Sequence, residues 1–197
     1  RVTVGNGNLE MSTTEGTLAN GAAVINATLE IEAGTQIVAS PGFPNTVITR
    51  GSKIEANGTA EAPIIMSSED DGFDGNQEWG GLILQGYGNH NTCTAGAACN
   101  VDSEGESGFA GGFTPDDDSG TLRYLIVAEG GFEFAVGNEI NGISFVGVGS
   151  GTTVEYIQVH GNFDDGVEFY GGSVNAKYVV LTANGDESLD WDEGYVG

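Results

Sequence analysis

The sequence predicts an all-β chain folded as a right-handed parallel β-helix, a β-solenoid with coils of about 22 residues. The first observation is a repeat: residues 156–172 match residues 178–194, with apolar positions on apolar positions and acidic on acidic. That step is the length of one solenoid coil, whose short parallel strands stack on those of the coil before. The second observation is composition, because 34 of 197 residues are glycine among many Val, Ile, Thr and aromatic residues. This mixture is typical of short strands joined by tight turns.

The amino-terminal part contains a second repeat, in which residues 31–33 match residues 54–56 at a step of 23. Apolar and polar residues alternate there, which predicts half-buried strands rather than a helix. Residues 79–84 (WGGLIL) predict a further strand. A β-sandwich is the alternative fold, but it needs hairpin turns every 8–12 residues. Nearly constant steps at two separate places favour the solenoid.

Residues 86–120 interrupt the pattern and predict one long loop projecting from the stack. The loop contains Cys93 and Cys99, which we expect to form a disulfide in an oxidising, extracytoplasmic compartment. A zinc site is the weaker hypothesis, because the chain has no second cysteine pair and only two histidines. Strands resume at Leu122 and continue to Trp191. We therefore predict a single domain, residues 1–197, with the loop as an insertion.

The charge is extreme: five basic residues stand against 29 acidic ones, a formal net charge of -24. Such a surface repels nucleic acid and anionic lipid, so neither is expected as a partner. We expect no membrane span, because the sequence has no apolar run of sufficient length. The acidity is typical of solubility in a salty medium, and it also suits divalent-cation binding by clustered oxygen ligands.

Six segments together resemble a group of secreted right-handed parallel β-helix proteins of Gram-negative bacteria, often marine or Bacteroidetes. They are residues 29–35 (LEIEAGT), 50–64 (RGSKIEANGTAEAPI), 79–84 (WGGLIL), 138–142 (NEING), 164–172 (DDGVEFYGG) and 190–194 (DWDEG). The resemblance spans residues 18–197. It implies the fold and secretion to the extracellular space or cell surface, and it carries over neither an activity nor catalytic residues.

The repeat stacks acidic residues on acidic residues about 4.8 Å apart. At that distance two like charges repel by about 3.5 kcal/mol at an effective dielectric constant of 20. The side chains can splay into water, raise their pKa values or share a cation. The sharper hypothesis is a Ca²⁺ ion held by Asp164, Asp165, Asp186 and Glu187. The turn containing Asp70, Asp71 and Asp74 is a second candidate, although it fails the EF-hand spacing and is equally typical of a solvated acidic turn.

An enzyme is not expected, but a polysaccharide-degrading activity stays open. Many parallel β-helices cleave polysaccharides, and Asp164, Asp165, Asp186 and His160 are the residues that would serve as acids and bases. The shortage of arginine and lysine argues against a uronate substrate or a lyase mechanism.

We therefore expect a secreted structural or surface protein stabilised by Ca²⁺. Both ends of the chain are strand-like, as in a cut precursor or in ends that pair with another chain. Uncapped solenoid ends expose backbone groups and invite head-to-tail stacking into a homo-oligomer or filament. The alternative is a carbohydrate-binding or adhesin module, in which Tyr170 and the loop aromatics Tyr87, Phe109 and Phe113 would contact the glycan.

Overall fold

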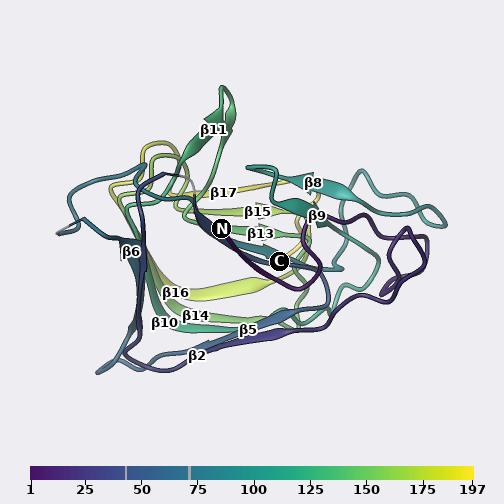
Figure 1. Cartoon of the computed structure of the whole chain (residues 1–197), viewed down its shortest axis with the longest axis horizontal. Coiled ribbons are helices and arrows are strands. Elements are labelled where there is room, and N and C mark those ends of the chain that lie inside the picture. Colours follow the sequence, from purple (N-terminus) through teal and green to yellow (C-terminus); the bar gives the residue numbers. More distant parts are fainter. Residues whose placement is uncertain (43, 71) are drawn as a thin grey trace.

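The computed structural model describes residues 1–42, 44–70 and 72–197 and consists of strands stacked in coils around a triangular core (Figure 1). The first face of the triangle is one parallel sheet. Its strands, in spatial order, are β1 (Val2–Val4), β4 (Asn45–Ile48), β7 (Gly81–Gln85), β13 (Ile143–Val146), β15 (Val167–Tyr170) and β17 (Leu189–Asp192). The parallel β-helix predicted from the sequence is thus confirmed.

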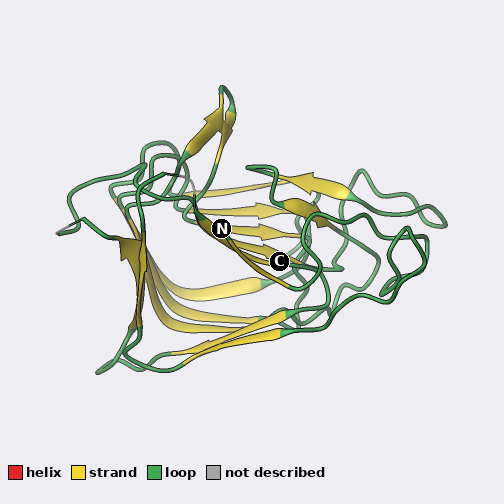
Figure 2. Cartoon of the chain, in the orientation of Figure 1, coloured by secondary structure: helices red, strands yellow, loops and turns green. Residues whose placement is uncertain are grey.

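The second and third faces share three long strands that bend from one face into the other (Figure 2). These strands are β10 (Gly120–Ala128), β14 (Thr153–His160) and β16 (Asn175–Thr182). The second face is completed by β2 (Thr28–Ile31) and β5 (Lys53–Asn57), and the third by β3 (Gln36–Ala39) and β6 (Ile64–Ser68).

The bend in each long strand lies at a tyrosine, namely Tyr124, Tyr156 and Tyr178. Their φ values of 46°, 56° and 59° lie in the left-handed region, which a bulky residue rarely occupies. The rings stack, with centroids 4.5 Å apart for the first pair and 4.4 Å for the second. Stacking of this kind contributes about 1 kcal/mol per pair and so offsets part of the backbone strain.

The core fills the inside of the triangle with inward-facing side chains from all three faces. Leu82, Phe145 and Phe169 come from the first face, and Leu125 and Ile157 from the bent strands. The rings of Phe145 and Phe169 stack at 5.2 Å, one coil above the other. Side chains that alternate with these point away from the core, and they carry the chemistry described below.

The predicted 22-residue step is confirmed in the last coil, where Val167 pairs with Leu189 and Ile157 with Val179. Earlier coils are longer because of insertions. The predicted step of 23 near the amino terminus is wrong. There Leu29 pairs with Ile54 and Ile31 with Ala56, a step of 25. A shift of two residues leaves every side chain on the same face, so alternation alone did not fix this register.

The long loop does not project along its whole length. It contains the hairpin β8 (Val101–Ser103) and β9 (Gly108–Ala110), which returns to the outer side of the first face. There Ala110 packs with Val47, Ile83 and Val146 in a second, smaller apolar cluster. The predicted disulfide Cys93–Cys99 is confirmed, with the two Cα atoms 5.2 Å apart. It fits the predicted oxidising compartment.

A second hairpin, β11 (Glu133–Ala135) with β12 (Asn138–Glu139), stands out above the first face (Figure 1). Within residues 1–42, 44–70 and 72–197, no helix is long and apolar enough to cross a bilayer.

Candidate functional site

The outer side of the first face carries one column of side chains that runs through five coils. In register these are Val47, Ile83, Ser144, Glu168 and Asp190. The first two are apolar and lie beneath the hairpin β8–β9. The column becomes acidic only in the last two coils. The sheet therefore places two carboxylates one coil apart on its outer side.

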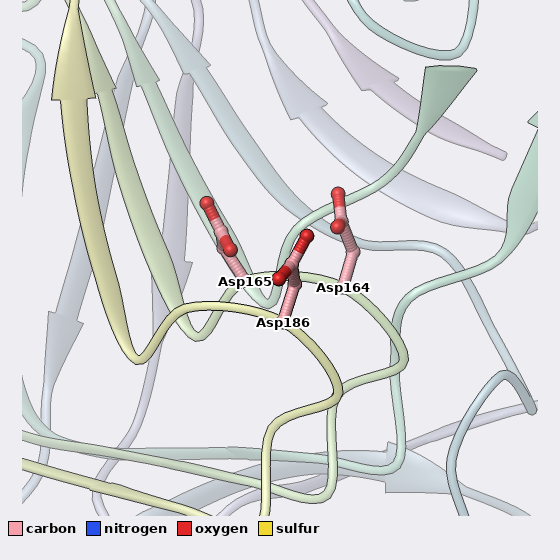
Figure 3. A group of neighbouring side chains, drawn as sticks. All are labelled: Asp164, Asp165 and Asp186. Atoms are coloured by element: carbon pink, nitrogen blue, oxygen red, sulfur yellow. The ribbon is translucent and has the colours of Figure 1, made fainter. Parts of the chain in front are cut away.

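The turns that enter β15 and β17 bring three more carboxylates to the same region. Asp164 and Asp165 lie on one turn and Asp186 on the next, and their side chains rise on the same side (Figure 3). One oxygen from each of the three lies within 4.8 Å of the others. Asp165, Glu168 and Asp190 form a second group with the same limit. Because Asp165 belongs to both groups, we call all five residues the carboxylate cluster.

Burial perturbs the titration of this cluster. Asp165 is 5% exposed and Glu168 is 7% exposed. Desolvation, followed by the charge of Asp164, raises the pKa of Asp165 to about 7. Desolvation, with the charge of Glu104, raises the pKa of Glu168 to about 8. The pKa of Asp164 rises to about 6 because of burial and the charges of Glu139 and Asp186. At neutral pH Glu168 is therefore largely protonated and Asp165 about half protonated, and a bound cation would favour the ionised forms of all three groups.

A polar network fastens the hairpin β8–β9 to the cluster. The side-chain amide of Asn141 donates to Glu168 Oε2 at 2.6 Å and to Glu104 Oε2 at 3.0 Å. The hydroxyl of Tyr170 donates to Glu168. Burial raises the pKa of Glu104 to about 7. Two carboxylates from different elements thus converge on one amide.

None of the ion pairs that the structure gives to the described residues involves the carboxylate cluster. Those pairs are Lys53 with Asp118, Arg123 with Glu155 and His90 with Glu193. The cluster's negative charge is therefore not balanced by a basic side chain. Only protonation or a bound cation can balance it.

The structure brings together three of the four residues predicted for the first metal site. Asp164, Asp165 and Asp186 meet, whereas the carboxylate of Glu187 belongs to neither close group. Glu187 contributes instead its backbone N–H, which donates to Asp165 Oδ1 at 2.8 Å. The side chain of Glu187 is exposed, because it faces solvent on the outermost turn.

His160 is not part of the cluster's hydrogen bonding. Its Nδ1 lies 2.8 Å from Thr182 Oγ1 and its Nε2 lies 3.1 Å from the carbonyl oxygen of Phe73. Both ring nitrogens are therefore engaged elsewhere, and the predicted grouping of His160 with the aspartates as acids and bases is not assembled.

The second candidate site stays a prediction, because Asp71 lies outside the described residues. Asp70 and Asp74 belong to neither of the close carboxylate groups found among the residues that the structure describes. The backbone N–H of Asp70 donates to Ser68 Oγ at 3.1 Å.

The aromatic residues predicted to contact a glycan do not form one surface. Tyr87 is buried with Met11 and Leu18. Tyr170, predicted to be exposed, is half-buried under the hairpin β8–β9 and donates to Glu168. Phe109 is half-buried, and only Phe113 is exposed. The loop aromatics thus mostly pack the loop onto the stack.

Sequence reasoning missed Glu104 and Asn141. Glu104 lies in the long loop, where no repeat indicates which face it will meet. Asn141 is part of the NEING segment at 138–142, and a polar residue just before a buried strand was the one available signal. Its side chain is fully buried and also accepts from the backbone N–H of Asp165 at 3.2 Å.

The chemistry of the cluster suits a hard divalent cation. Ca²⁺ binds oxygen ligands at 2.3–2.6 Å, so two ligand atoms on one ion lie at most about 5 Å apart. The limit of 4.8 Å in each group meets this requirement. The arrangement therefore fits a shared ion.

Comparison with known proteins gives a family and no nearer relative. No curated protein and no solved structure matches the chain. One family model matches residues 8–197, which is nearly the whole sequence and includes all three faces of the triangle and the carboxylate cluster. The chain belongs to the family of the pectate-lyase-like beta helix domain.

Proposed function

We propose that this chain is a Ca²⁺-binding β-helix domain of a secreted or surface-displayed protein, with the ion held by Asp164, Asp165 and Asp186. The observation that carries the proposal is the approach of three carboxylate oxygens within 4.8 Å without a basic partner among the described ion pairs. Binding one divalent ion would offset the desolvation and the mutual repulsion that raise the pKa values of Asp164 and Asp165. Secretion is supported by the disulfide and by the resemblance to secreted β-helix proteins.

Calorimetric titration of the chelator-treated protein with Ca²⁺ tests this function. The expected result is a saturable site that is lost in Asp186→Asn, an exposed position where the substitution leaves the core intact. The matched control is Asp116→Asn, an exposed aspartate outside both close groups. If Asp70→Asn removes binding and Asp186→Asn does not, the ion belongs to the 70–74 turn. Absence of binding in the unmodified protein contradicts the proposal.

A second candidate function is head-to-tail self-association, supported by the end of the stack. Leu189 and Trp191 follow the inward-facing positions of Val167 and Phe169, yet Trp191 is 60% exposed at this edge of the described stack. With Phe169 and Tyr195 they line an open apolar hollow of about 380 Å³. Strands β16 and β17 each pair on one side only, as β1 and β2 do at the other end. A second copy can therefore add parallel strands to this edge.

Electron microscopy and sedimentation in Ca²⁺ and in EDTA test the self-association. We expect oligomers or filaments that Trp191→Glu disperses, because the substitution places a charge in the apolar hollow. Monomers at high protein concentration in both solutions would refute it. Filaments that persist in EDTA would retain the polymer and separate it from the ion.

Polysaccharide cleavage has less support. Both ring nitrogens of His160 are engaged with Thr182 and Phe73, so this residue is not free to act beside the aspartates. The family's name refers to pectate lyase, so pectate is the first substrate to test. Product formation that disappears in Asp165→Asn would establish an enzyme and displace the structural role.

A further inference from the structure

A groove of about 440 Å³ runs along the corner between the second and third faces, beside the stacked rings of Tyr124, Tyr156 and Tyr178. The residues two positions after these tyrosines complete much of its lining: Ile126, Gln158 and Val180. The intervening residues Leu125, Ile157 and Val179 also line the groove, so each of three successive coils contributes the same three positions. The groove therefore runs parallel to the axis of the stack.

The groove is uncharged in a highly charged chain. None of its eleven lining residues is acidic or basic, although the sequence has 29 acidic and five basic residues. Arg123 and Glu155 lie beside the lining. The guanidinium carbon of Arg123 is 5.9 Å from the centroid of the Tyr156 ring, and its Nη2 lies 3.2 Å from Glu155 Oε2, so these two charges offset each other. The net charge of -24 repels an anionic occupant, and the groove offers no carboxylate to a cationic one. Electrostatics therefore favours a neutral occupant.

The lining combines apolar surface with hydrogen-bonding groups. Tyr178 is 63% exposed and Val180 is 52% exposed, so the groove is accessible from solvent. The tyrosine hydroxyls and the amide of Gln158 donate and accept hydrogen bonds, whereas the rings and aliphatic side chains present apolar area. A hydrocarbon ligand would leave those polar groups without partners, which is unfavourable. Sugar units satisfy both, because their C–H faces are apolar and their hydroxyls hydrogen-bond.

The spacing of the groove is periodic, with ring centroids 4.5 Å and 4.4 Å apart along the stack. A surface that repeats in steps suits a linear chain of repeating units better than a compact ligand. We propose that this tyrosine groove binds a neutral polysaccharide that lies along the stack axis. The site is separate from the carboxylate cluster, which lies on the first face, and it does not depend on Ca²⁺.

Affinity electrophoresis in native gels tests the groove, because a protein of this charge migrates rapidly unless an immobilised polymer retards it. The neutral probes are hydroxyethylcellulose, galactomannan and dextran, and polygalacturonate is the anionic comparator. We expect retardation by at least one neutral probe, none by polygalacturonate in EDTA, and equal affinity for the neutral probe in Ca²⁺ and in EDTA. This independence of Ca²⁺ separates failure of the groove from failure of the ion site.

Two variants locate the binding. Tyr178→Ala removes the most exposed ring, and Val180→Glu places a charge in the groove from a surface position that does not disturb the core. Each is expected to weaken binding about tenfold or more, which corresponds to about one lost aromatic contact. Phe113→Ala, an exposed aromatic outside the groove, is the control and should bind normally.

Three results would overturn the proposal. One is the absence of retardation by every neutral probe. Another is retardation that is unchanged in both groove variants while circular dichroism shows that they are folded. The third is a concentration-dependent dimer that Val180→Glu abolishes, since the occupant of the groove would then be a second copy of the chain.

Discussion

Replacing Asp165 by asparagine should make the ion-free protein more stable at mildly alkaline pH. Burial, with the charge of Asp164, raises the pKa of Asp165 from 3.8 to about 7. The folded state therefore holds a proton that the unfolded chain releases near pH 4. Stability is complete below about pH 4 and falls as the pH rises towards about 7. A gap of about three pH units corresponds to about 4 kcal/mol.

Asparagine removes this penalty and keeps a hydrogen-bond acceptor for the backbone N–H of Glu187, now 2.8 Å from Asp165 Oδ1. In EDTA at about pH 8, the variant should therefore be more stable than the original protein by up to about 4 kcal/mol. For a chain of this size, each kcal/mol shifts Tm by about 2–4 °C. At about pH 4 the two proteins should differ by less than about 1 kcal/mol, because the penalty develops only as the pH rises above the unfolded-state pKa.

Calcium should reduce this difference of up to about 4 kcal/mol to about 1 kcal/mol. At a Ca²⁺ concentration about a hundred times Kd, the original protein gains about 2.7 kcal/mol, whereas the variant gains little because a ligand is missing. Thermal unfolding followed by circular dichroism measures the stability difference between the two proteins in all four conditions, at each pH in EDTA and in Ca²⁺. Asp116→Asn is the control for a general loss of negative charge. The reasoning is refuted if the original protein in EDTA is equally stable at both pH values, or if the variant is the less stable one at alkaline pH.

Three further substitutions or treatments test the scaffold. Gly120 has a φ of +107°, and an added Cβ would lie 2.1 Å from the carbonyl oxygen of Ile54. Gly120→Ala should therefore lower the free energy of unfolding, measured in urea, by about 4 kcal/mol or more. Gly137→Ala, in open space at a φ of +72°, should cost only about 1 kcal/mol and serves as its control. Arg50 is buried and donates to the carbonyl oxygens of Cys99 at 2.6 Å and of Gly111 at 2.9 Å. Arg50→Met leaves these two acceptors unpaired and should lower the free energy of unfolding by about 3 kcal/mol. Equal midpoints for Arg50→Met and the original protein would show that water replaces those bonds. Reduction of Cys93–Cys99 should cost about 2 kcal/mol, as expected for a closed loop of this length, and an unchanged Tm in reductant would contradict that.

The fold was predictable where the repeat is free of insertions. The match of residues 156–172 with 178–194 placed Glu168 on Asp190 and Phe169 on Trp191, as the sheet does. The repeat near the amino terminus gave the correct faces but a register wrong by two residues. The reason is physical: a strand's side-chain period is two, so a shift of two residues leaves its pattern of burial unchanged.

The candidate site was predictable only in part, for a different reason. Stacked turns necessarily bring Asp164, Asp165 and Asp186 together, and the repeat shows those turns. The burial of Glu168 depends instead on the hairpin β8–β9 folding back over the first face, where Glu104 joins it through Asn141. Contacts between an insertion and a sheet face leave no periodic signal in the sequence.

The unequal lengths of the coils have a consequence for the order of folding. Strand β14 meets β16 after a step of 22 residues, whereas β5 meets β10 only after 66. Closing the longer loop costs about 1 kcal/mol more in chain entropy, before any contact compensates for it. The β14–β16 pair and the β2–β5 pair, which close after 22 and 25 residues, should therefore form before β5 meets β10. Destabilising changes in β14 or β16 would then slow refolding, while changes confined to the contact between β5 and β10 would chiefly accelerate unfolding.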